Sequence, residues 1–132
     1  MTDLKAGDSA SRSMTITDDT IRVFADVTTD TNPLHLDDEY AAGTRFGKRI
    51  AHGMISAGLI SATIANDLPG PGTVYLNQTL KFKLPVFPGD TVTATIEVLT
   101  VREDKPIVTL GTVCTNQDDA VVLEGEAVVL VS

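Results

Sequence analysis

Residues 53–67 of this chain read GMISAGLISATIAND, and only Ser56, Ser61 and Thr63 interrupt its apolar residues and glycines before the polar end. At helical spacing these apolar side chains cover nearly every face, which predicts a helix that is buried all round. At about 1.5 Å per residue, such a helix is long enough to cross a small domain. The run PGPG at residues 69–72 is expected to end it.

The chain beyond this helix is predicted to form strands. In residues 91–98, Val, Ala and Ile alternate with Thr and Glu, a period of two that is typical of a strand with one face in the core. Three further segments rich in β-branched and aromatic residues also predict strands: 74–84, 107–115 and 121–131. Because the connections are short, the strands are expected to pair antiparallel. We therefore predict the α+β class, with an antiparallel sheet wrapped around the long helix.

The part of the chain before the long helix predicts shorter elements. Residues 7–16 are polar and rich in Ser and Thr, as in a short edge strand. Thr17 is expected to cap a helix that ends near residue 28, since two aspartates follow it and face the positive end of the helix dipole. Residues 37–42 predict another short helix, which a glycine ends.

Length and composition predict one globular domain over residues 1–132. Of the 132 residues, 42% are apolar and 21% are charged, an ordinary globular mixture. No apolar run approaches the roughly 18 residues that a membrane span needs. The net charge of −8 argues against a nucleic-acid partner, because phosphate binding requires concentrated Lys and Arg. The candidates for binding an anionic ligand are scattered basic residues of a kind that usually forms solvated surface: Lys48, Arg49, Lys81 and Lys83.

The sequence predicts a cytoplasmic protein. Residues 1–20 carry charged side chains and no apolar h-region, so no signal peptide is expected. Cys114 is the only cysteine and cannot form an internal disulfide, which fits a reducing compartment. Its place in a predicted strand indicates a packing role.

The candidate catalytic residues lie in residues 30–35, which read DTNPLH. Pro33 fixes its own φ and keeps Asn32 out of the helical region, which predicts an extended or turning loop. In such a loop Asp30 and His35 can point to one place, and both side chains can hold and move protons. The alternatives are structural: Asp30 can form an Asx turn, and a single histidine is more often structural than catalytic.

These residues resemble a known family. The run Asp30-x-Asn32-Pro33-x-His35, followed by Phe46, Ile50, His52-Gly53-Met54, Leu80-Lys81-Phe82 and Pro88-Gly89-Asp90, resembles the R-specific enoyl-CoA hydratases of the MaoC-like, hotdog-fold group. Within that group it resembles the short bacterial form that supplies (R)-3-hydroxyacyl-CoA to polyhydroxyalkanoate synthesis. The resemblance runs from about residue 17 to the C-terminus. It implies a sheet curled around a long helix, and a homodimer with acyl-CoA lying between the protomers.

The resemblance also implies roles for individual residues. Asp30 and His35 would be the catalytic pair, Asn32 would orient them, and the backbone N–H of Gly53 would face the thioester oxygen. The implied reaction adds water reversibly across a short to medium trans-2-enoyl-CoA and needs no cofactor. No metal site is expected, because the two histidines are seventeen residues apart and no third ligand completes a pattern.

Further residues are candidates for substrate contact. Ser61 either bonds back to the carbonyl four residues earlier or faces the substrate beside the thioester. Met54, Ala57, Ile64 and Val128 are expected in the core, and those that line an acyl pocket would set the chain length by their bulk. His52 is expected to be structural, capping or bracing the loop before the helix.

Two other functions are compatible with this sequence. A hotdog thioesterase would need a carboxylate poised against the thioester carbonyl, and the Asp-x-Asn-Pro-x-His arrangement favours the hydratase. A non-catalytic acyl-CoA-binding module is disfavoured because both Asp30 and His35 are present. An acyl-carrier protein could take the place of CoA as the carrier of the substrate.

Overall fold

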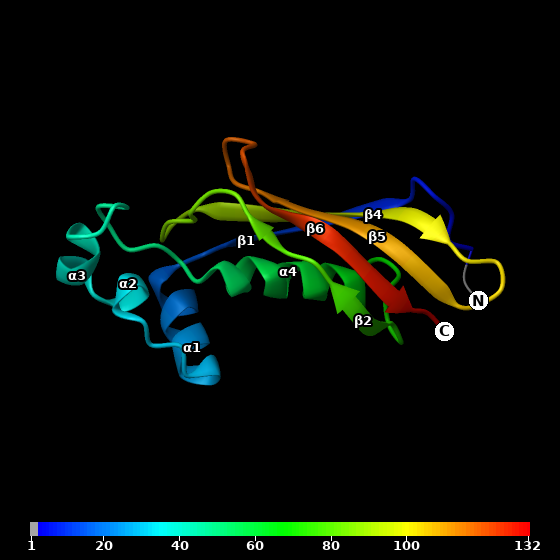
Figure 1. Ribbon diagram of the computed structural model, residues 1–132, viewed down its shortest axis with the longest axis horizontal. Helices are drawn as coiled ribbons and strands as arrows, with labels where there is room; N and C mark the ends of the chain where they lie inside the picture. The colour runs from blue at the N-terminus through cyan, green and yellow to red at the C-terminus, as the bar shows by residue number, and fades with distance from the viewer. Residues whose placement is uncertain (1–2) are drawn as a thin grey trace.

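The computed structural model describes residues 3–132 and consists of a sheet with a long helix along one face (Figure 1). Strand β1 (Ser9–Thr15) comes first, and four helices follow: α1 (Asp18–Thr28), α2 (Pro33–Leu36), α3 (Asp38–Ala42) and α4 (Gly53–Asn66). The rest of the chain forms five strands: β2 (Val74–Gln78), β3 (Lys81–Phe82), β4 (Thr91–Val101), β5 (Ile107–Thr115) and β6 (Val121–Leu130). The predicted α+β class is confirmed.

The sheet has the strand order β1-β4-β5-β6-β2, and β3 also pairs with β6. All of these pairings are antiparallel. Strands β4, β5 and β6 pair in chain order, as their short connections predict. Strand β1 lies at one edge, which confirms the edge strand expected in residues 7–16.

One predicted strand is divided in two. Residues 74–84 form β2 and β3 instead of one continuous strand. The backbone between them passes so close to β6 that a Cβ atom at Gly125 would overlap the carbonyl oxygen of Thr79. A bulge between Tyr75 and Asn77 further interrupts the pairing. This close approach bends the chain away from regular strand geometry.

The core lies between the sheet and one side of α4. The four apolar residues that alternate along β4 are completely buried, as predicted: Val92, Ala94, Ile96 and Val98. Helix α4 packs against them with Ile55, Leu59, Ile60 and Ile64, all at most 5% exposed. Cys114 of β5 is also completely buried, which agrees with a packing role. Among residues 3–132, no helix has the length and apolar character that crossing a bilayer requires.

The prediction that α4 is buried all round is wrong for one of its sides. The sheet covers α4 from a single direction (Figure 1), and the opposite side lies open in this chain. Met54 is 51% exposed, Gly58 is exposed, and Ala57 and Ser61 are only half-buried. Apolar periodicity alone does not distinguish burial within one chain from burial against another molecule.

The helix that begins at Pro33 was not expected. Asn32 lies outside the helical region, at φ −55° and ψ 126°, as predicted, but its side chain accepts a hydrogen bond from the N–H of Leu34 and so caps α2. Proline is well suited to the first position of a helix, where no hydrogen bond is lost. His35 therefore lies on a short helix, and the prediction of an extended or turning loop is wrong at this residue.

The other short helices agree with the sequence. The hydroxyl of Thr17 accepts a hydrogen bond from the N–H of Thr20 at 3.1 Å and caps α1. Helix α3 ends at Gly43, as predicted. Between them, α1, α2 and α3 form a group at one end of the sheet, next to the start of α4 (Figure 1).

Candidate active site

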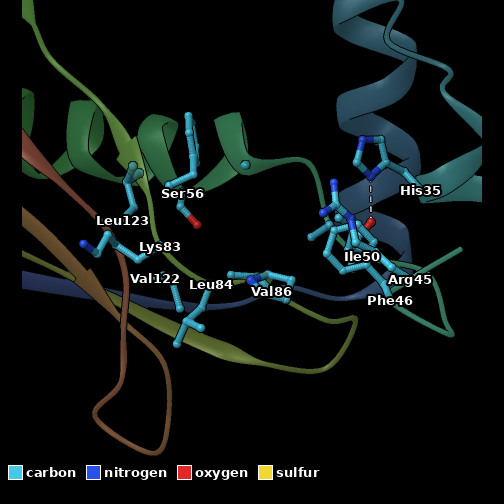
Figure 2. A pocket seen from close by; sticks show the side chains of 14 residues that line it. His35, Arg45, Phe46, Ile50, Ser56, Lys83, Leu84, Val86, Val122 and Leu123 are labelled. Atoms are coloured by element: carbon cyan, nitrogen blue, oxygen red, sulfur yellow. Dashed lines mark hydrogen bonds between the residues drawn. The ribbon is translucent and has the colours of Figure 1, made fainter.

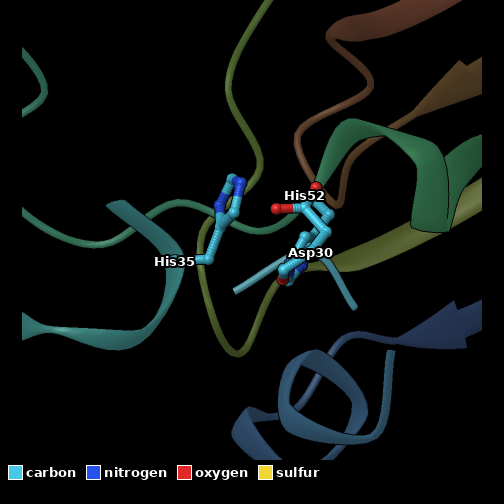
Figure 3. Close-up of side chains that lie close together, drawn as sticks. All are labelled: Asp30, His35 and His52. Carbon is cyan, nitrogen blue, oxygen red and sulfur yellow. The ribbon is translucent and has the colours of Figure 1, made fainter. Parts of the chain in front are cut away.

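Asp30, His35 and His52 come together where α1, α2 and the start of α4 meet (Figure 3). A carboxylate oxygen of Asp30 and one ring nitrogen from each histidine lie within 4.8 Å of one another. Asp30 is exposed, whereas His35 is 9% exposed and His52 only 2%. The structure thus brings the predicted pair together, with His52 as a third member.

Contacts with the backbone fix the orientation and the tautomer of His35. Its Nδ1 atom lies 2.7 Å from the carbonyl oxygen of Ile50. Because a carbonyl can only accept, Nδ1 carries the hydrogen in the neutral ring, and Nε2 keeps its lone pair. The N–H of Ile50 in turn donates to the carbonyl of Leu34. Nε2 is therefore available to accept a proton or a hydrogen bond from water.

Asp30 combines a local turn with a free carboxylate oxygen. Its Oδ1 accepts a hydrogen bond from the N–H of Asn32 at 3.3 Å, so the Asx turn named as an alternative is present. Its Oδ2 forms no hydrogen bond with the residues that the structure describes. The turn and an acid–base role are therefore compatible. Asn32 acts on the site by capping α2, the helix that carries His35.

The side chain of Arg49 ties the three short helices together. Its guanidinium, 14% exposed, donates to Asp18 of α1 at 2.6 Å, to Asp38 of α3 at 2.7 Å and to the backbone carbonyl of His35 at 3.2 Å. Hydrogen bonds from Arg49 and Arg22 hold the pKa of Asp18 below its usual value. Among the basic residues considered for anion binding, Arg49 is thus already bonded within the chain.

A first cavity, here called the His35 cavity, has a volume of about 440 Å³. His35, Gly53, Ser56 and Phe82 contribute to its largely apolar wall, and the cations Arg45 and Lys83 lie toward opposite ends of it (Figure 2). Lys83 is also 3.6 Å from Glu124. Of the four basic residues that the sequence suggested for anion binding, Lys83 alone lines this cavity. Arg45 also lines it but was not predicted, because nothing in the sequence distinguishes it from its neighbours.

Gly53 places the free N-terminal end of α4 at the wall of the His35 cavity. It is the first residue of the helix, so its N–H has no partner within the helix. The Phe82 ring packs so closely that a Cβ atom at this position would lie 2.6 Å from Phe82 Cε1. A helix N-terminus favours negative charge. The geometry is therefore suited to a developing oxyanion, the role that the resemblance implies for Gly53.

A second cavity, here called the Asp30 cavity, has a volume of about 690 Å³ and lies along the open side of α4. Three of the predicted substrate-contact residues line it together with Asp30: Met54, Ala57 and Ser61. The back-bonded hydroxyl expected for Ser61 occurs instead at Thr63, which donates to the carbonyl of Leu59 at 2.8 Å. The Ser61 hydroxyl has no hydrogen bond with the described residues and faces this cavity.

The other two predicted contact residues lie outside both cavities. Ile64 is 2% exposed and packs in the core. Val128 lies between Ala127 and Val129, which are completely buried on the α4 side of β6. Because side chains alternate along a strand, Val128 points to the opposite face of the sheet.

Tyr75 and Gln78 line the Asp30 cavity and were not found from the sequence. The Tyr75 hydroxyl donates to Gln78 Oε1 at 2.5 Å, and Gln78 Nε2 donates to the buried hydroxyl of Thr112 at 2.9 Å. Burial raises the pKa of Tyr75 to about 12. In a regular strand, residues three apart point to opposite faces, and the bulge after Tyr75 changes this alternation. No pattern in the sequence indicates that bulge.

The Asp30, His35 and His52 cluster has the ligand types of a transition-metal site without the corresponding geometry. A bound ion lies in the plane of each imidazole that ligates it. The rings of His35 and His52 are stacked instead, with centroids 3.9 Å apart and planes inclined by 31°. One nitrogen of each ring is bonded to a backbone carbonyl, an arrangement that metal-binding histidines also show, so only the stacking of the rings argues against an ion here. This arrangement gives no support to a metal centre.

Comparison with known proteins places the chain in a family. Residues 4–118 match the MaoC like domain. The chain is 53% identical over 129 residues to an (R)-specific enoyl-CoA hydratase of Rhodospirillum rubrum, which covers 98% of this chain and 89% of that protein. It is 52% identical over 109 residues to the (R)-specific enoyl-CoA hydratase of Aeromonas caviae, covering 83% of this chain and 81% of that one.

The fold comparison agrees. The solved structure of the (R)-hydratase from A. caviae involved in PHA biosynthesis superposes with a TM-score of 0.96 at 46% identity, over the full length of both chains. The predicted hotdog architecture is thereby confirmed. From the domain match, the sequence identity and the common fold, the chain belongs to the MaoC-like family.

Proposed function

We propose that this protein is an R-specific enoyl-CoA hydratase, which adds water reversibly to short and medium trans-2-enoyl-CoA to give (R)-3-hydroxyacyl-CoA. The observation that carries the proposal is the approach of the Asp30 carboxylate to the His35 ring within 4.8 Å. Both residues match the motif by which the sequence resembles these hydratases. The 53% identity to a protein of that activity gives independent support.

The pair is suited to activating one water molecule. The Asp30 carboxylate and the lone pair of His35 Nε2 are both acceptors, so a water between them donates one hydrogen bond to each. At ordinary hydrogen-bond lengths of about 2.8 Å, such a water fits a gap of this size. As its oxygen bonds to C3, one of the two groups takes a proton and returns it to C2 on the same face. The product then carries hydroxyl at C3 and the added hydrogen at C2.

Negative charge that develops on the thioester oxygen during this addition needs a partner. The N–H of Gly53 and the N-terminal end of α4 can supply it at the wall of the His35 cavity. The loss of one such donor in other enzymes costs about 3 kcal/mol of transition-state stabilisation. The electrostatic contribution of Gly53 would thus be comparable to that of the acid–base pair.

The two cavities provide room for the two ends of the substrate. The acyl chain lies in the Asp30 cavity, along Met54 and Ala57. The carrier arm leaves through the His35 cavity, where Arg45 and Lys83 supply positive charge for its phosphates. A phosphopantetheine arm on an acyl-carrier protein has the same chemistry near the thioester. The assay described below distinguishes CoA from acyl-carrier protein as the carrier.

A homodimer accounts for the open side of α4. Met54 is 51% exposed, and Val23 and Val27 on the neighbouring helix α1 are 61% and 77% exposed. A second copy over this apolar surface would cover these residues and close the Asp30 cavity. Size-exclusion chromatography with light scattering tests this, and a monomer with full activity would contradict it.

A cytoplasmic location and a supply of (R)-3-hydroxyacyl-CoA for polyhydroxyalkanoate synthesis stay predictions from the sequence.

The direct test is an assay with crotonyl-CoA. We expect loss of the absorbance of the conjugated thioester and, by chiral analysis, formation of (R)-3-hydroxybutyryl-CoA. Release of free CoA without hydration would instead identify a thioesterase, and binding without turnover would identify an acyl-CoA-binding module. A parallel assay with crotonyl-acyl-carrier protein separates the two carriers by their kcat/KM values.

A further inference from the structure

We infer that His52 is a positioning residue that holds the Asp30 carboxylate and the His35 ring in the geometry for hydration. The inference rests on the proposed function and assigns His52 no direct contact with substrate. His52 immediately precedes α4, and its ring lies beside Asp30 and His35 (Figure 3).

A hydrogen bond connects His52 to the backbone of Asp30. Its Nε2 atom lies 2.9 Å from the Asp30 carbonyl oxygen, which can only accept, so Nε2 carries the hydrogen. Asp30 lies just beyond Thr29, a residue in the left-handed region at φ 65° that ends α1. The bond from His52 therefore fixes the segment between α1 and α2 on which the catalytic carboxylate stands.

The ring of His52 also forms a surface against which His35 packs. The two imidazole centroids are 3.9 Å apart, and Phe24 packs against His52 with centroids 4.9 Å apart. Through the peptide bond, the same residue is connected to Gly53, the proposed oxyanion donor. His52 thus contacts, or is bonded to, all three proposed catalytic groups.

Packing alone does not account for a histidine at this position. The Nδ1 atom is buried and has no hydrogen-bond partner among the described residues. The side chain makes no capping hydrogen bond to α4 either. A buried polar atom without a partner destabilises the fold, and an apolar side chain of similar size would avoid that loss. The compensating feature in this structure is the bond to Asp30.

This role predicts a specific kinetic effect. His52 lines neither the His35 cavity nor the Asp30 cavity. Its replacement should therefore leave KM nearly unchanged and lower kcat, because only the alignment of the reacting groups is lost. A misplacement of about 1 Å can lower the rate of an enzyme by about 10²-fold.

Three substitutions test the inference in the full-length protein with crotonyl-CoA. In His52→Gln the amide nitrogen occupies the place of Nε2 and can still donate to Asp30, whereas in His52→Asn it occupies the place of Nδ1 and cannot. His52→Leu fills the space without a donor. We expect His52→Gln to keep kcat within about tenfold of the wild-type value. His52→Asn and His52→Leu should each lower kcat by about 10²-fold at unchanged KM. Thermal unfolding should rank the variants differently, with Leu at least as stable as Gln.

The same experiment can overturn the inference. If His52 only fills the core, His52→Leu should have both a higher kcat and a higher Tm than His52→Gln. A rise in KM with constant kcat would make His52 a binding residue. If Leu does not fold, equal kcat values for Gln and Asn would still contradict the proposed hydrogen bond. A wild-type protein without hydratase activity would overturn the proposed function first and this role with it.

Discussion

His35 Nδ1 donates a hydrogen bond to the carbonyl oxygen of Ile50 at 2.7 Å. Ile50 stands three residues before α4, so the segment that orients the imidazole also leads to the N–H of Gly53. The ring and the start of α4 therefore share one support. This relationship supports the proposal that His35 and the N–H of Gly53, from separate parts of the sequence, act on one substrate.

Removal of either Asp30 or His35, the proposed catalytic pair, should abolish most of the activity. We expect Asp30→Asn and His35→Ala each to lower kcat for crotonyl-CoA by about 10²–10⁴-fold, the range typical of a lost acid or base. Circular dichroism should show an unchanged fold. Asp26→Asn is the matched control, because Asp26 is exposed on α1. Near-full activity in either catalytic variant would contradict the proposed roles.

A methyl group at residue 53 should interfere with the oxyanion site. In Gly53→Ala the new Cβ would lie 2.6 Å from Phe82 Cε1, so the ring or the helix start must move. We expect kcat to fall by about 10²-fold, which corresponds to the loss of one oxyanion donor. Gly43→Ala is the control, because Gly43 is at φ −84° and a Cβ there would make only an ordinary contact, 3.6 Å from the Tyr40 carbonyl oxygen. Recovery of activity in the double variant Gly53→Ala/Phe82→Ala would show that the ring causes the loss.

Bulk in the Asp30 cavity should change the preferred chain length. Ala57→Leu adds volume to the wall of this cavity, so kcat/KM for octenoyl-CoA should fall more than for crotonyl-CoA. Each buried methylene that no longer fits removes about 0.8 kcal/mol of binding. Ile64→Val is the comparison: it shortens a core residue, should destabilise the protein by about 0.5–1.5 kcal/mol, and should leave the preference unchanged. Equal effects on the two substrates in Ala57→Leu would place the acyl chain elsewhere.

Arg49 should support catalysis from outside the cavities. Arg49→Met removes the bonds to Asp18, to Asp38 and to the His35 carbonyl. We expect a lower Tm and a lower kcat at nearly constant KM, because α2 loses its attachment to its neighbours. Arg102→Met is the control, since among residues 3–132 the Arg102 side chain pairs only with Asp104, in a distant exposed turn. An unchanged kcat in Arg49→Met would show that α2 is held by other contacts.

The same network should contribute to the acid sensitivity of the fold. Asp18 has a pKa below its ordinary value of 3.8, caused mainly by hydrogen bonds from Arg49 and Arg22. A lowered carboxylate pKa stabilises the folded state above the ordinary value, and this contribution is lost as the pH falls through the folded-state pKa. The Tm difference between wild type and Arg49→Met should therefore have its largest value at pH 7 and become smaller below about pH 4. A difference that grows in acid would contradict this assignment.

The sequence predicts the regular elements better than their surroundings. The alternation of residues 91–98 and the apolar run of α4 specify a strand and a helix, because burial on one face or stripe leaves a periodic pattern. The pairing of Asp30 with His35 was also foreseen. Helix α2 was not, since an Asn-Pro pair is compatible with both a turn and a capped helix start.

The residues missed or misplaced depend on distant contacts. Tyr75 reaches the Asp30 cavity because a bulge changes the alternation of β2, and bulges have no fixed sequence pattern. Arg45 lines the His35 cavity through the path of an irregular segment. The open side of α4 is also largely apolar, with Met54, Ala57 and Gly58. A single sequence does not tell which of these surfaces another molecule covers.

Asp30 has two proposed tasks, one for each carboxylate oxygen: Oδ1 closes the turn at Asn32, and Oδ2, which has no hydrogen bond among the described residues, would act as the base. Glutamate would keep the charge, but its extra methylene would carry the carboxylate out of reach of the turn. Asparagine would keep the turn without supplying a base. Over evolutionary time, this position should therefore admit fewer substitutions than either task alone would require.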